Sequence, residues 1–338
     1  MKILAFESSC DDTCAAVVED GRRVLSSRIS SQTDTHALYG GVVPEIASRM
    51  HTEAVSSLCR LALEDAGLSL SEIDAIAVTN GPGLIGALLV TLSFAKGLAL
   101  TTGLPLIPVH HVRAHIAANY LAFPELEPPF VALAASGGTT AFIHVAGYND
   151  YRFLGGTRDD AAGEAFDKVG RCLGLPYPAG AAMDRLAEQG DPRAFTFPHP
   201  GFEDAPLDCS FSGLKTAVIN TVHRMEQKGQ EVPKADLCAS FCRTVGEVLV
   251  PRMMEAVRLA GADTLCMGGG VAANAHLRAA ARAACDRAGI RLCIPALSYC
   301  GDNAAMVGAL AYYAYREGLT AGQECNAYAT MDIQHPRF

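Results

Sequence analysis

Residues 3–26 read ILAFESSCDDTCAAVVEDGRRVLS and open the chain with a strand, a turn and a second strand. An apolar strand is predicted at 3–7, a polar turn follows it, and another strand is predicted at 13–19. Asp20 and Gly21 then supply the kind of two-residue sequence that closes a β-hairpin. The pattern therefore predicts an antiparallel hairpin that continues into a third strand.

The same order returns at residues 130–154, FVALAASGGTTAFIHVAGYNDYRFL, where two predicted strands flank a Ser-Gly-Gly-Thr-Thr turn. After each hairpin the chain alternates between short apolar strands and longer helical segments. These expected elements are strands at 73–78, 104–109, 264–267 and 291–294, and helices at 83–99, 241–260, 274–288 and 304–317. A hairpin followed by alternating units in both halves predicts an α/β fold of two similar domains with a central cleft.

The chain has 338 residues, which is long enough for two domains. The proline-rich stretch 123–129 marks the expected first crossing between them. We expect the first domain to comprise residues 1–125 plus 306–338 and to carry the histidine-rich helix described below. The second domain is expected to comprise residues 126–305.

Charge and cysteine content restrict the classes of function. The net charge is −9, whereas a protein that binds nucleic acid by itself usually carries a basic excess, so such a role would need a local basic patch or a helper protein. Twelve cysteines without a CxxC pair are typical of reduced thiols in a cytoplasmic protein. The early acidic Glu7 argues against a signal peptide. The apolar stretch 84–100 contains Lys96 and is predicted to be a core helix.

Residues 110–115, HHVRAH, carry the strongest functional signal. His111 and His115 are four positions apart, so on a helix both imidazoles lie on one face. Two such imidazoles can hold a borderline divalent cation with a third ligand from elsewhere in the fold, and Asp302, in a Gly-Asp-Asn turn, is the candidate. In isolation this spacing more often belongs to two exposed surface histidines, so the assignment depends on the neighbouring motifs.

Two glycine-rich turns, Ser136-Gly137-Gly138 and Gly268-Gly269-Gly270, directly follow predicted strands. Glycine lets backbone amides approach an anion closely, so both turns are candidate phosphate sites, although neither continues as a Walker A motif. Each turn taken alone also fits a tight turn with no ligand. The acidic segment 159–168 has the composition of a solvated helix start, while Asp167 within it is a candidate to accept hydrogen bonds from a ribose.

Eight short motifs follow one another along residues 3–308. They are ILAFESSCDDT (3–13), GGVVPEIASRMH (40–51), GPGLIGALLV (81–90), VHHVRAHIAA (109–118), DDAAGEAFDKVGRCLGLPYPAG (159–180), SFSGLKTA (210–217), GGGVAANAHLR (268–278) and GDNAAMVG (301–308). In this order they resemble the motifs of the TsaD (Gcp) family of bacterial tRNA threonylcarbamoyladenosine transferases. The resemblance covers nearly the whole chain.

The resemblance implies a fold, a reaction and a set of partners. The fold would be the actin-like ATPase (ASKHA) fold, with two duplicated RNase H-like domains. The reaction would transfer threonylcarbamoyl from threonylcarbamoyl-AMP to the exocyclic amine of the adenosine at tRNA position 37, just 3′ of the anticodon, in tRNAs that read codons beginning with A. One Fe²⁺ or Zn²⁺ ion is implied, and ATP with Mg²⁺ is a further candidate ligand. A TsaB-like paralogue, a TsaE-like ATPase and a TsaC-like synthase that supplies the adenylate would be the partners, with no membrane involved.

Site residues also follow from the resemblance. It implies that His111, His115 and Asp302 are the metal ligands. The implied substrate-binding positions are Ala134, Ala135, Ser136, Gly137, Gly138, Asp167, Gly180, Asp184 and Asn274. The turn Asp11-Asp12 matches an acidic pair near the transfer site, and Asp11, or a phosphate oxygen of the substrate, is the candidate general base.

The sequence departs from the family pattern at several positions near these residues. Val112, Arg113 and Ala114 stand where the family often has Met-Glu-Gly, Thr139 replaces a histidine, and Asp12 replaces a glutamate. The metal-binding and nucleotide-binding positions themselves remain, so the departures affect the surroundings of the site.

Three other functions fit part of the sequence. A zinc metallopeptidase needs His-Glu-x-x-His, but Val112 follows His111, so the catalytic base is missing. A small-molecule kinase on the same fold needs no His-His-Asp site, because its Mg²⁺ enters with the nucleotide. A non-catalytic paralogue would be expected to lose the three ligands. Acyl transfer to tRNA therefore accounts for more of the sequence than any alternative.

Overall fold

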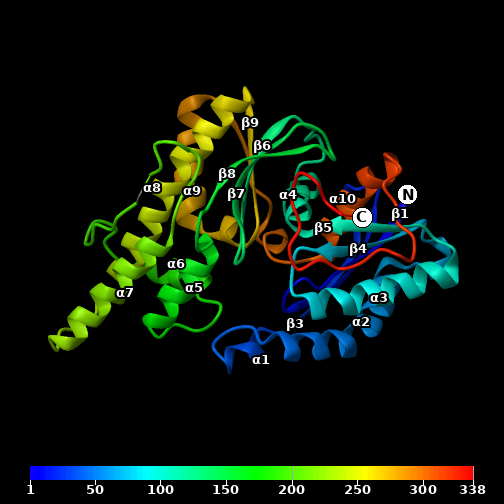
Figure 1. Ribbon diagram of the computed structural model, residues 1–338, viewed down its shortest axis with the longest axis horizontal. Coiled ribbons are helices and arrows are strands. Elements are labelled where there is room, and N and C mark those ends of the chain that lie inside the picture. The colour runs from blue at the N-terminus through cyan, green and yellow to red at the C-terminus, as the bar shows by residue number, and fades with distance from the viewer. Residues whose placement is uncertain (200, 338) are drawn as a thin grey trace. The chain divides into compact units, whose positions relative to one another are not determined.

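The computed structural model describes residues 1–199 and 201–337 and contains two five-stranded sheets (Figure 1). One compact unit comprises Met1–Pro128, Ala146–Tyr151 and the chain from Pro295 onward, and the other comprises Pro129–Val145 and Arg152–Ile294. Residues 295–305 therefore group with the first unit, whereas the boundaries expected from the sequence assigned them to the second. Residues 200 and 338, which fall within the expected ranges, lie outside the described residues.

The first unit is built on a sheet with the strand order β3-β2-β1-β4-β5. Its strands are β1 (Lys2–Glu7), β2 (Asp12–Glu19), β3 (Arg23–Ser31), β4 (Ala75–Gly81) and β5 (Leu106–His110), and its helices are α1 (Thr33–Ala37), α2 (Pro44–Ala66), α3 (Ile85–Thr102), α4 (His111–Ala122) and α10 (Ala304–Arg316), with 3-10 turns at Leu70–Glu72 and Leu297–Tyr299. The first three strands are antiparallel, whereas β1, β4 and β5 run parallel.

Helices cover both faces of this sheet. Helices α2 and α3 pack over a core that contains Phe6, Val17 and Leu92, while α10 lies on the opposite face beside α4. Helix α10 packs so closely on β2 that position 308 must be glycine, because a Cβ there would lie 2.7 Å from a methyl group of Val18. Helix α3 is long and apolar enough to cross a membrane by length and composition alone. One face of it, with Leu88, Leu92 and Ala95, is buried against the core, but only 33% of the helix is buried, so it is a half-exposed helix rather than the fully buried core helix expected.

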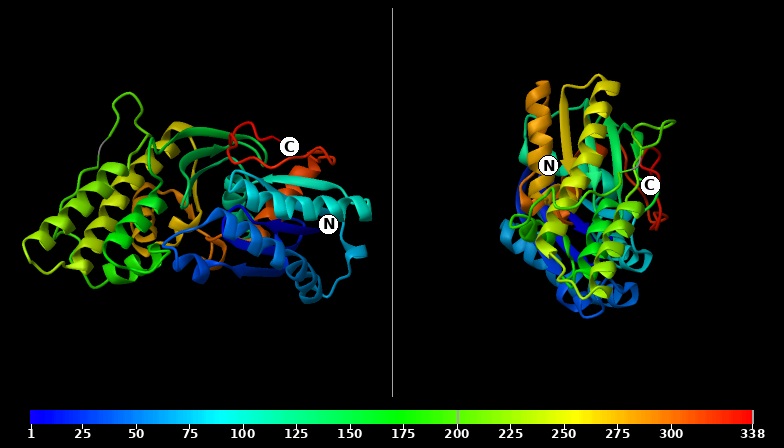
Figure 2. Two further views of the ribbon diagram at one scale, coloured as in Figure 1. Left: turned by 60° about the horizontal axis from the view of Figure 1, so that its bottom comes forward. Right: turned by 90° about the vertical axis from the view of Figure 1, so that its left-hand side faces the viewer.

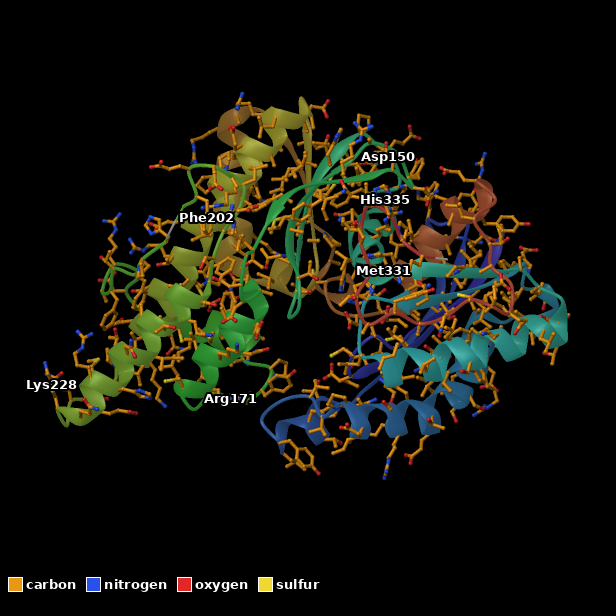
Figure 3. All side chains as sticks on the ribbon, viewed as in Figure 1. Asp150, Arg171, Phe202, Lys228, Met331 and His335 are labelled. Atoms are coloured by element: carbon orange, nitrogen blue, oxygen red, sulfur yellow. The ribbon has the colours of Figure 1, made fainter. Side chains whose placement is uncertain are left out.

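The chain after α10 runs as an extended segment along the first unit (Figure 2). The Tyr328 amide donates to the Asn80 carbonyl at 2.8 Å, and the Asn80 side chain donates to the Arg337 carbonyl at 2.8 Å. Met331 and His335, labelled in Figure 3, belong to this segment. No structure is predicted for this segment from the sequence, because its contacts are made with residues distant in the chain, such as Asn80.

The second unit repeats the topology of the first, with the order β10-β9-β6-β7-β8. Its strands are β6 (Phe130–Ala135), β7 (Thr140–Val145), β8 (Tyr151–Gly156), β9 (Thr264–Gly268) and β10 (Arg291–Cys293), and its helices are α5 (Ala162–Cys172), α6 (Gly180–Ala187), α7 (Ser212–Gln227), α8 (Lys234–Ala260) and α9 (Ala275–Ala288), with a 3-10 turn at Gly270–Ala273. In both sheets the two strands of the hairpin, β1 with β2 and β6 with β7, pair antiparallel. The first strand of each hairpin also pairs in parallel with the next strand after the hairpin unit, β1 with β4 and β6 with β9. The internal repeat predicted from the two hairpins is confirmed.

The two glycine-rich turns of the second unit are neighbours. Gly269 has a φ of +90°, and a Cβ at this position would lie 2.3 Å from the carbonyl oxygen of Ala135. The turn after β9 therefore packs directly on the end of β6, where the other glycine-rich turn begins. Only glycine fits this position, since both the backbone angle and the space exclude a side chain.

Candidate metal centre and active site

The histidine-rich helix α4 follows strand β5 without a loop, and His110 is its N-cap. Nδ1 of His110 accepts hydrogen bonds from the amides of Val112 and Arg113, at 3.2 and 3.4 Å. Burial lowers the pKa of His110 to about 3, so its ring stays neutral and able to accept. His110 thus holds the start of the helix, which leaves His111 and His115 as the candidate ligands.

His111, His115 and Asp302 lie together in the first unit. The rings of His111 and His115 are edge to face with centroids 4.6 Å apart. Asp302 Oδ1 lies 3.1 Å from His115 Nε2 and 3.7 Å from His111 Nε2. One donor atom from each of the three side chains lies within 4.8 Å of the other two. The structure therefore brings together the three ligands implied by the sequence.

The surroundings of His115 fit a bound cation. His115 is 2% exposed, and neither ring nitrogen has a hydrogen-bond partner among the described residues, although Nε2 lies at ion-pair distance from Asp302. A buried ring nitrogen without a partner, as at Nδ1, is unfavourable unless another group satisfies it. Two histidines and one carboxylate form a ligand set that suits Zn²⁺ or Fe²⁺ and leaves positions open for substrate. These residues therefore fit one divalent ion.

Glu7 is a buried carboxylate behind His111, and the sequence analysis did not identify it as functional. It has no exposed surface, and its Oε2 lies 3.1 Å from His111 Nδ1. Thr79 and the amide of Ser9 also donate hydrogen bonds to Glu7. The available signal was an acid at the end of an otherwise apolar strand, ILAFE.

The charges around His111 are strongly coupled. Burial alone would lower the pKa of His111, but Glu7 and Asp302 raise it to about 9. Burial alone would raise the pKa of Asp302, and the charges of His111 and His115 bring it below its usual value instead. Burial also acts to raise the pKa of Glu7, but the charge of His111 and its hydrogen bond lower it below its usual value. The pocket is thus built for positive charge between two carboxylates.

The Asp11-Asp12 turn lies beside this centre. Ser9 in the same turn has its hydroxyl 3.0 Å from His111 Nδ1, and the Cys14 thiol on β2 lies 3.7 Å from the carbonyl oxygen of Asp302. Burial raises the pKa of Asp12 to about 6, and the charge of Asp302 adds to this effect. A carboxyl group with such a pKa can exchange protons near neutral pH.

In the second unit the structure joins two of the implied substrate positions. The Asn274 amide donates to Asp184 Oδ1 at 2.7 Å, and the Ala275 amide donates to Asp184 Oδ2 at 2.9 Å. These residues come from the start of α9 and from α6, about ninety positions apart in the chain. Asn274 is also the N-cap of α9, since its side chain accepts from the Leu277 amide.

Asp167 and Gly180 also lie in one place. Asp167 Oδ1, on α5, accepts a hydrogen bond at 2.8 Å from the Ala179 amide, immediately before Gly180. The Gly163 amide, at the start of the same helix, donates to the Ser136 carbonyl at 3.2 Å. Helix α5 therefore connects the Asp167 and Gly180 positions to the turn at Ser136–Gly138, with Ala134 and Ala135 at the buried end of β6.

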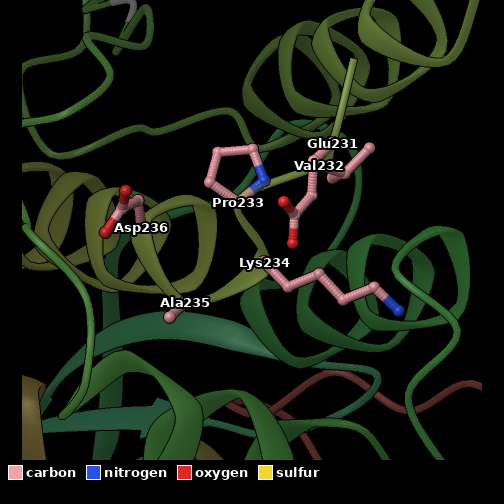
Figure 4. Close-up of a pocket in the computed structure, with 6 residues that line it drawn as sticks. All are labelled: Glu231, Val232, Pro233, Lys234, Ala235 and Asp236. Atoms are coloured by element: carbon pink, nitrogen blue, oxygen red, sulfur yellow. The ribbon is translucent and has the colours of Figure 1, made fainter. Parts of the chain in front are cut away.

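Two other features contain none of the implied residues. Asp160 forms ion pairs with Lys168 and Lys215, and Asp159 accepts from the backbone at the start of α7, so these two acids have structural partners. A surface hollow lined by the consecutive residues 231–236 lies at the start of α8 (Figure 4). Neither feature is a candidate catalytic site.

Solved structures resemble the chain in fold. One match is the component A of (R)-2-hydroxyglutaryl-CoA dehydratase from Acidaminococcus fermentans, with a TM-score of 0.56, 15% identity and coverage of 94% of this chain and 98% of that chain. At this identity the likeness concerns the fold alone. Together with the duplicated sheets and the His-His-Asp cluster, it defines an actin-like ATPase (ASKHA) fold that carries a candidate divalent-metal centre.

Sequence comparison identifies the family within this class. A family model described as tRNA N6-adenosine threonylcarbamoyltransferase, TsaD, matches residues 23–309. A protein of that name from Clostridium botulinum (strain 657 / Type Ba4) is 48% identical over 333 residues, and one from Clostridium beijerinckii (strain ATCC 51743 / NCIMB 8052) is 50% identical over 331 residues. Each alignment covers 98% of both chains. The chain belongs to the TsaD family, and the resemblance inferred from its motifs is confirmed.

Proposed function

We propose that this protein transfers the threonylcarbamoyl group from threonylcarbamoyl-AMP to the exocyclic amine of adenosine 37, next to the anticodon, in tRNAs that read codons beginning with A. The observation that carries the proposal is full-length membership of the family together with an intact His111, His115 and Asp302 cluster. The target base lies in a loop, so it can enter a site without the breaking of base pairs.

The metal would be one Fe²⁺ or Zn²⁺ ion held by His111, His115 and Asp302. When bound, such an ion polarises substrate oxygens and orients them. Glu7 would fix the orientation of the His111 ring through Nδ1, which leaves Nε2 directed toward the ion.

The second unit would bind the adenylate, and the same loops would accept ATP with Mg²⁺ as a competing nucleotide. The amides of Ser136, Gly137 and Gly138 are suited to negative charge on a phosphate. The carboxylates of Asp167 and Asp184 would accept hydrogen bonds from hydroxyl groups, and Asn274 would contribute its amide. Ala134, Ala135 and Gly180 would shape the site without polar side chains.

The chain's own residues would act mainly by position and charge. The adenine amine is a poor nucleophile, but the adenylate is an activated donor with AMP as its leaving group. As the bond from nitrogen to the carbamoyl carbon forms, the carbon–oxygen bond to AMP breaks and one N–H proton must leave. Asp12 has the raised pKa of a base near neutral pH, while Asp11 in the same turn is the other candidate.

The partners would be a TsaB-like paralogue, a TsaE-like ATPase and a TsaC-like synthase that produces the adenylate. We infer a cytoplasmic location, which suits the twelve free cysteines and a tRNA substrate. The acidic net charge of −9 suggests that a partner supplies basic surface for tRNA.

Reconstitution tests the proposal. The protein is combined with its partners, threonylcarbamoyl-AMP and tRNA, and modified adenosine is quantified by mass spectrometry. We expect His115→Ala to lower single-turnover transfer at least about 100-fold, or about 2.7 kcal/mol, and the exposed α7 variant His223→Ala to have no effect. The base is identified by comparing transfer in two variants, Asp11→Asn and Asp12→Asn, each of which removes one of the two candidate carboxylates. Absence of product with the wild-type protein, where another family member is active, would refute the assignment.

A further inference from the structure

A second cluster of metal-ligating side chains lies in the second unit, apart from the His111, His115 and Asp302 set. Asp184 on α6, Cys242 on α8 and His276 on α9 each place one donor atom within 4.8 Å of the other two. His276 Nδ1 lies 2.8 Å from Asp184 Oδ1. Three helices thus direct a carboxylate, a thiol and an imidazole toward one point.

The Asn274 amide group lies between two of these side chains. Its Nδ2 is 2.7 Å from Asp184 Oδ1 and 3.8 Å from Cys242 Sγ. The amide therefore fills the space in which a cation would sit between the carboxylate and the thiol. A bound cation would replace the weakly positive amide hydrogens as the partner of the carboxylate and the thiol.

The cluster is accessible on one side and buried on the other. Cys242 is 2% exposed, whereas the side chains of Asp184 and His276 are 18% and 31% exposed. An ion could enter past the carboxylate and the imidazole, and water could complete its coordination. Ligand atoms around tetrahedral zinc lie roughly 3.3 to 3.8 Å apart, given bonds of about 2.0–2.3 Å. Reaching this geometry requires the Asn274 amide to leave its position and the exposed carboxylate and imidazole to close on the ion.

Capping of helix α9 accounts for only part of the arrangement. The Asp184 carboxylate accepts hydrogen bonds from the Asn274 side chain and the Ala275 amide and lies within hydrogen-bond distance of His276. These contacts stabilise the start of the helix. Cys242 takes part only through its long contact with the Asn274 side chain, at 3.8 Å. Its thiol adds a soft donor to a nitrogen and an oxygen donor, which is a combination that selects zinc-like ions over Mg²⁺ or Ca²⁺.

We propose that Asp184, Cys242 and His276 form a second binding site, for a zinc-like divalent cation, in the second unit. On binding, the Cys242 thiol releases its proton to solvent and the Asn274 amide gives up its contacts with Asp184 and the sulfur. If Asp184 and Asn274 bind the adenylate, as the proposed function holds, the bound cation is a competitive inhibitor of that substrate.

Cobalt titration of the full-length, metal-stripped protein tests the site directly. Co²⁺ bound by a thiolate has an intense near-ultraviolet charge-transfer band, which the thiol-free His111, His115 and Asp302 set cannot produce. We expect the wild-type protein to bind two equivalents of Co²⁺ and to develop this band. A variant with both His111→Ala and His115→Ala should bind one equivalent and keep the band, which separates the second site from the first.

Cysteine variants identify the ligand. Cys242→Ser should abolish the band and leave one equivalent bound, whereas Cys238→Ser, a buried cysteine one turn earlier on α8, should keep it. If Cys242→Ser does not fold, the more exposed His276→Ala provides the test and should weaken band formation at least tenfold. A wild-type protein without the band, or a band that survives Cys242→Ser because Cys10 or another thiol is the ligand, overturns the proposal. The measurement involves no tRNA or adenylate, so its failure leaves the transferase assignment intact.

Discussion

Glu7 lies at the end of β1 with no exposed surface, yet the pKa of its carboxyl group is lowered, so it is ionised. An ionised group in such a place needs strong partners, and it has His111, Thr79 and the Ser9 amide. A carboxylate on the far nitrogen of a ligating histidine fixes the tautomer and orientation of the ring and increases its basicity.

Replacement of Glu7 by glutamine should therefore weaken metal binding without removing a ligand. Glu7→Gln keeps the size of the side chain but loses its charge, and we expect metal affinity to fall by roughly 10- to 100-fold. The measurement is competition with a chelator of known affinity. Glu53→Gln on the exposed side of α2 is the control and should have no effect. Equal retention of metal by Glu7→Gln and wild type would show that the contact with His111 is not used.

The histidines illustrate what local sequence can and cannot predict. The four-residue spacing placed His111 and His115 on one face because helical geometry is local. The cap formed by His110 could not be read from the sequence, because it depends on how β5 turns into α4. Asp302 lies almost two hundred positions away, so only its turn motif and the family resemblance pointed to it.

At the scale of elements, His51 ties helix α2 to the turn between β1 and β2. It has no exposed surface, its Nε2 donates to the Cys10 carbonyl at 2.9 Å, and its Nδ1 accepts from the Thr13 hydroxyl at 2.7 Å. The Thr13 contact needs the neutral ring, because a protonated Nδ1 cannot accept a hydrogen bond, whereas Nε2 can donate to Cys10 from either form. Burial lowers the pKa of His51, and the Cys10 carbonyl only partly opposes this effect.

This depressed pKa predicts a pH-dependent stability. Below about pH 6.5 the unfolded chain binds a proton at His51 that the folded chain does not, so the contribution of His51 to stability is present above that pH and is lost as the pH falls. His51→Gln should cost about 1–3 kcal/mol near neutral pH. The stability gap from wild type, followed by denaturant unfolding, should narrow between about pH 7.5 and pH 5.5. A constant gap would contradict this reading, and the exposed His223→Gln serves as the control.

Helix α5 and the turn at Ser136 form a second close contact between elements. A Cβ on Gly163 would lie 2.5 Å from the Ser136 oxygen and 2.8 Å from the Gly137 nitrogen, both backbone atoms that cannot move aside independently. Gly163→Ala should therefore destabilise the protein by about 1–3 kcal/mol and raise the KM for the adenylate. On α3, Gly97→Ala meets no described atom within 4 Å and should be stabilising by up to about 1 kcal/mol. Unchanged stability in Gly163→Ala would mean that α5 can shift away from the turn.

Elements with a clear pattern were predicted well, and those defined by tertiary contacts were not. The hairpins appear within a residue or two of the expected strands because apolar runs bounded by turn residues are a local signal. Helix α8 begins at Lys234 rather than 241, and Leu237, Cys238 and Ala239, which precede the expected start, are already buried in it. Family motifs overlap helices α2, α6 and α7, but no helix bounds were predicted for these segments.

At the scale of the whole molecule, the net charge is −9. In the acidic part of the second unit, several of the basic side chains are in addition paired with acids. Lys168 is paired with Asp160 and Glu164, and Lys215 is paired with Asp160. Arg158 is paired with Asp208. Cations held by neighbouring acids release few counterions from a nucleic acid, so they add little to its binding.

The protein alone should consequently bind tRNA weakly. We expect a dissociation constant of about 10⁻⁴ to 10⁻⁶ M or weaker at physiological salt, in the range of non-specific binding. Addition of the TsaB-like partner should tighten binding and make its dependence on salt steeper, because the partner would contribute the phosphate contacts. Fluorescence anisotropy with labelled tRNA over a salt series measures both quantities. Binding tighter than about 10⁻⁷ M by this chain alone, with a steep salt slope, would place the tRNA-binding surface on this chain and remove the need for a basic partner.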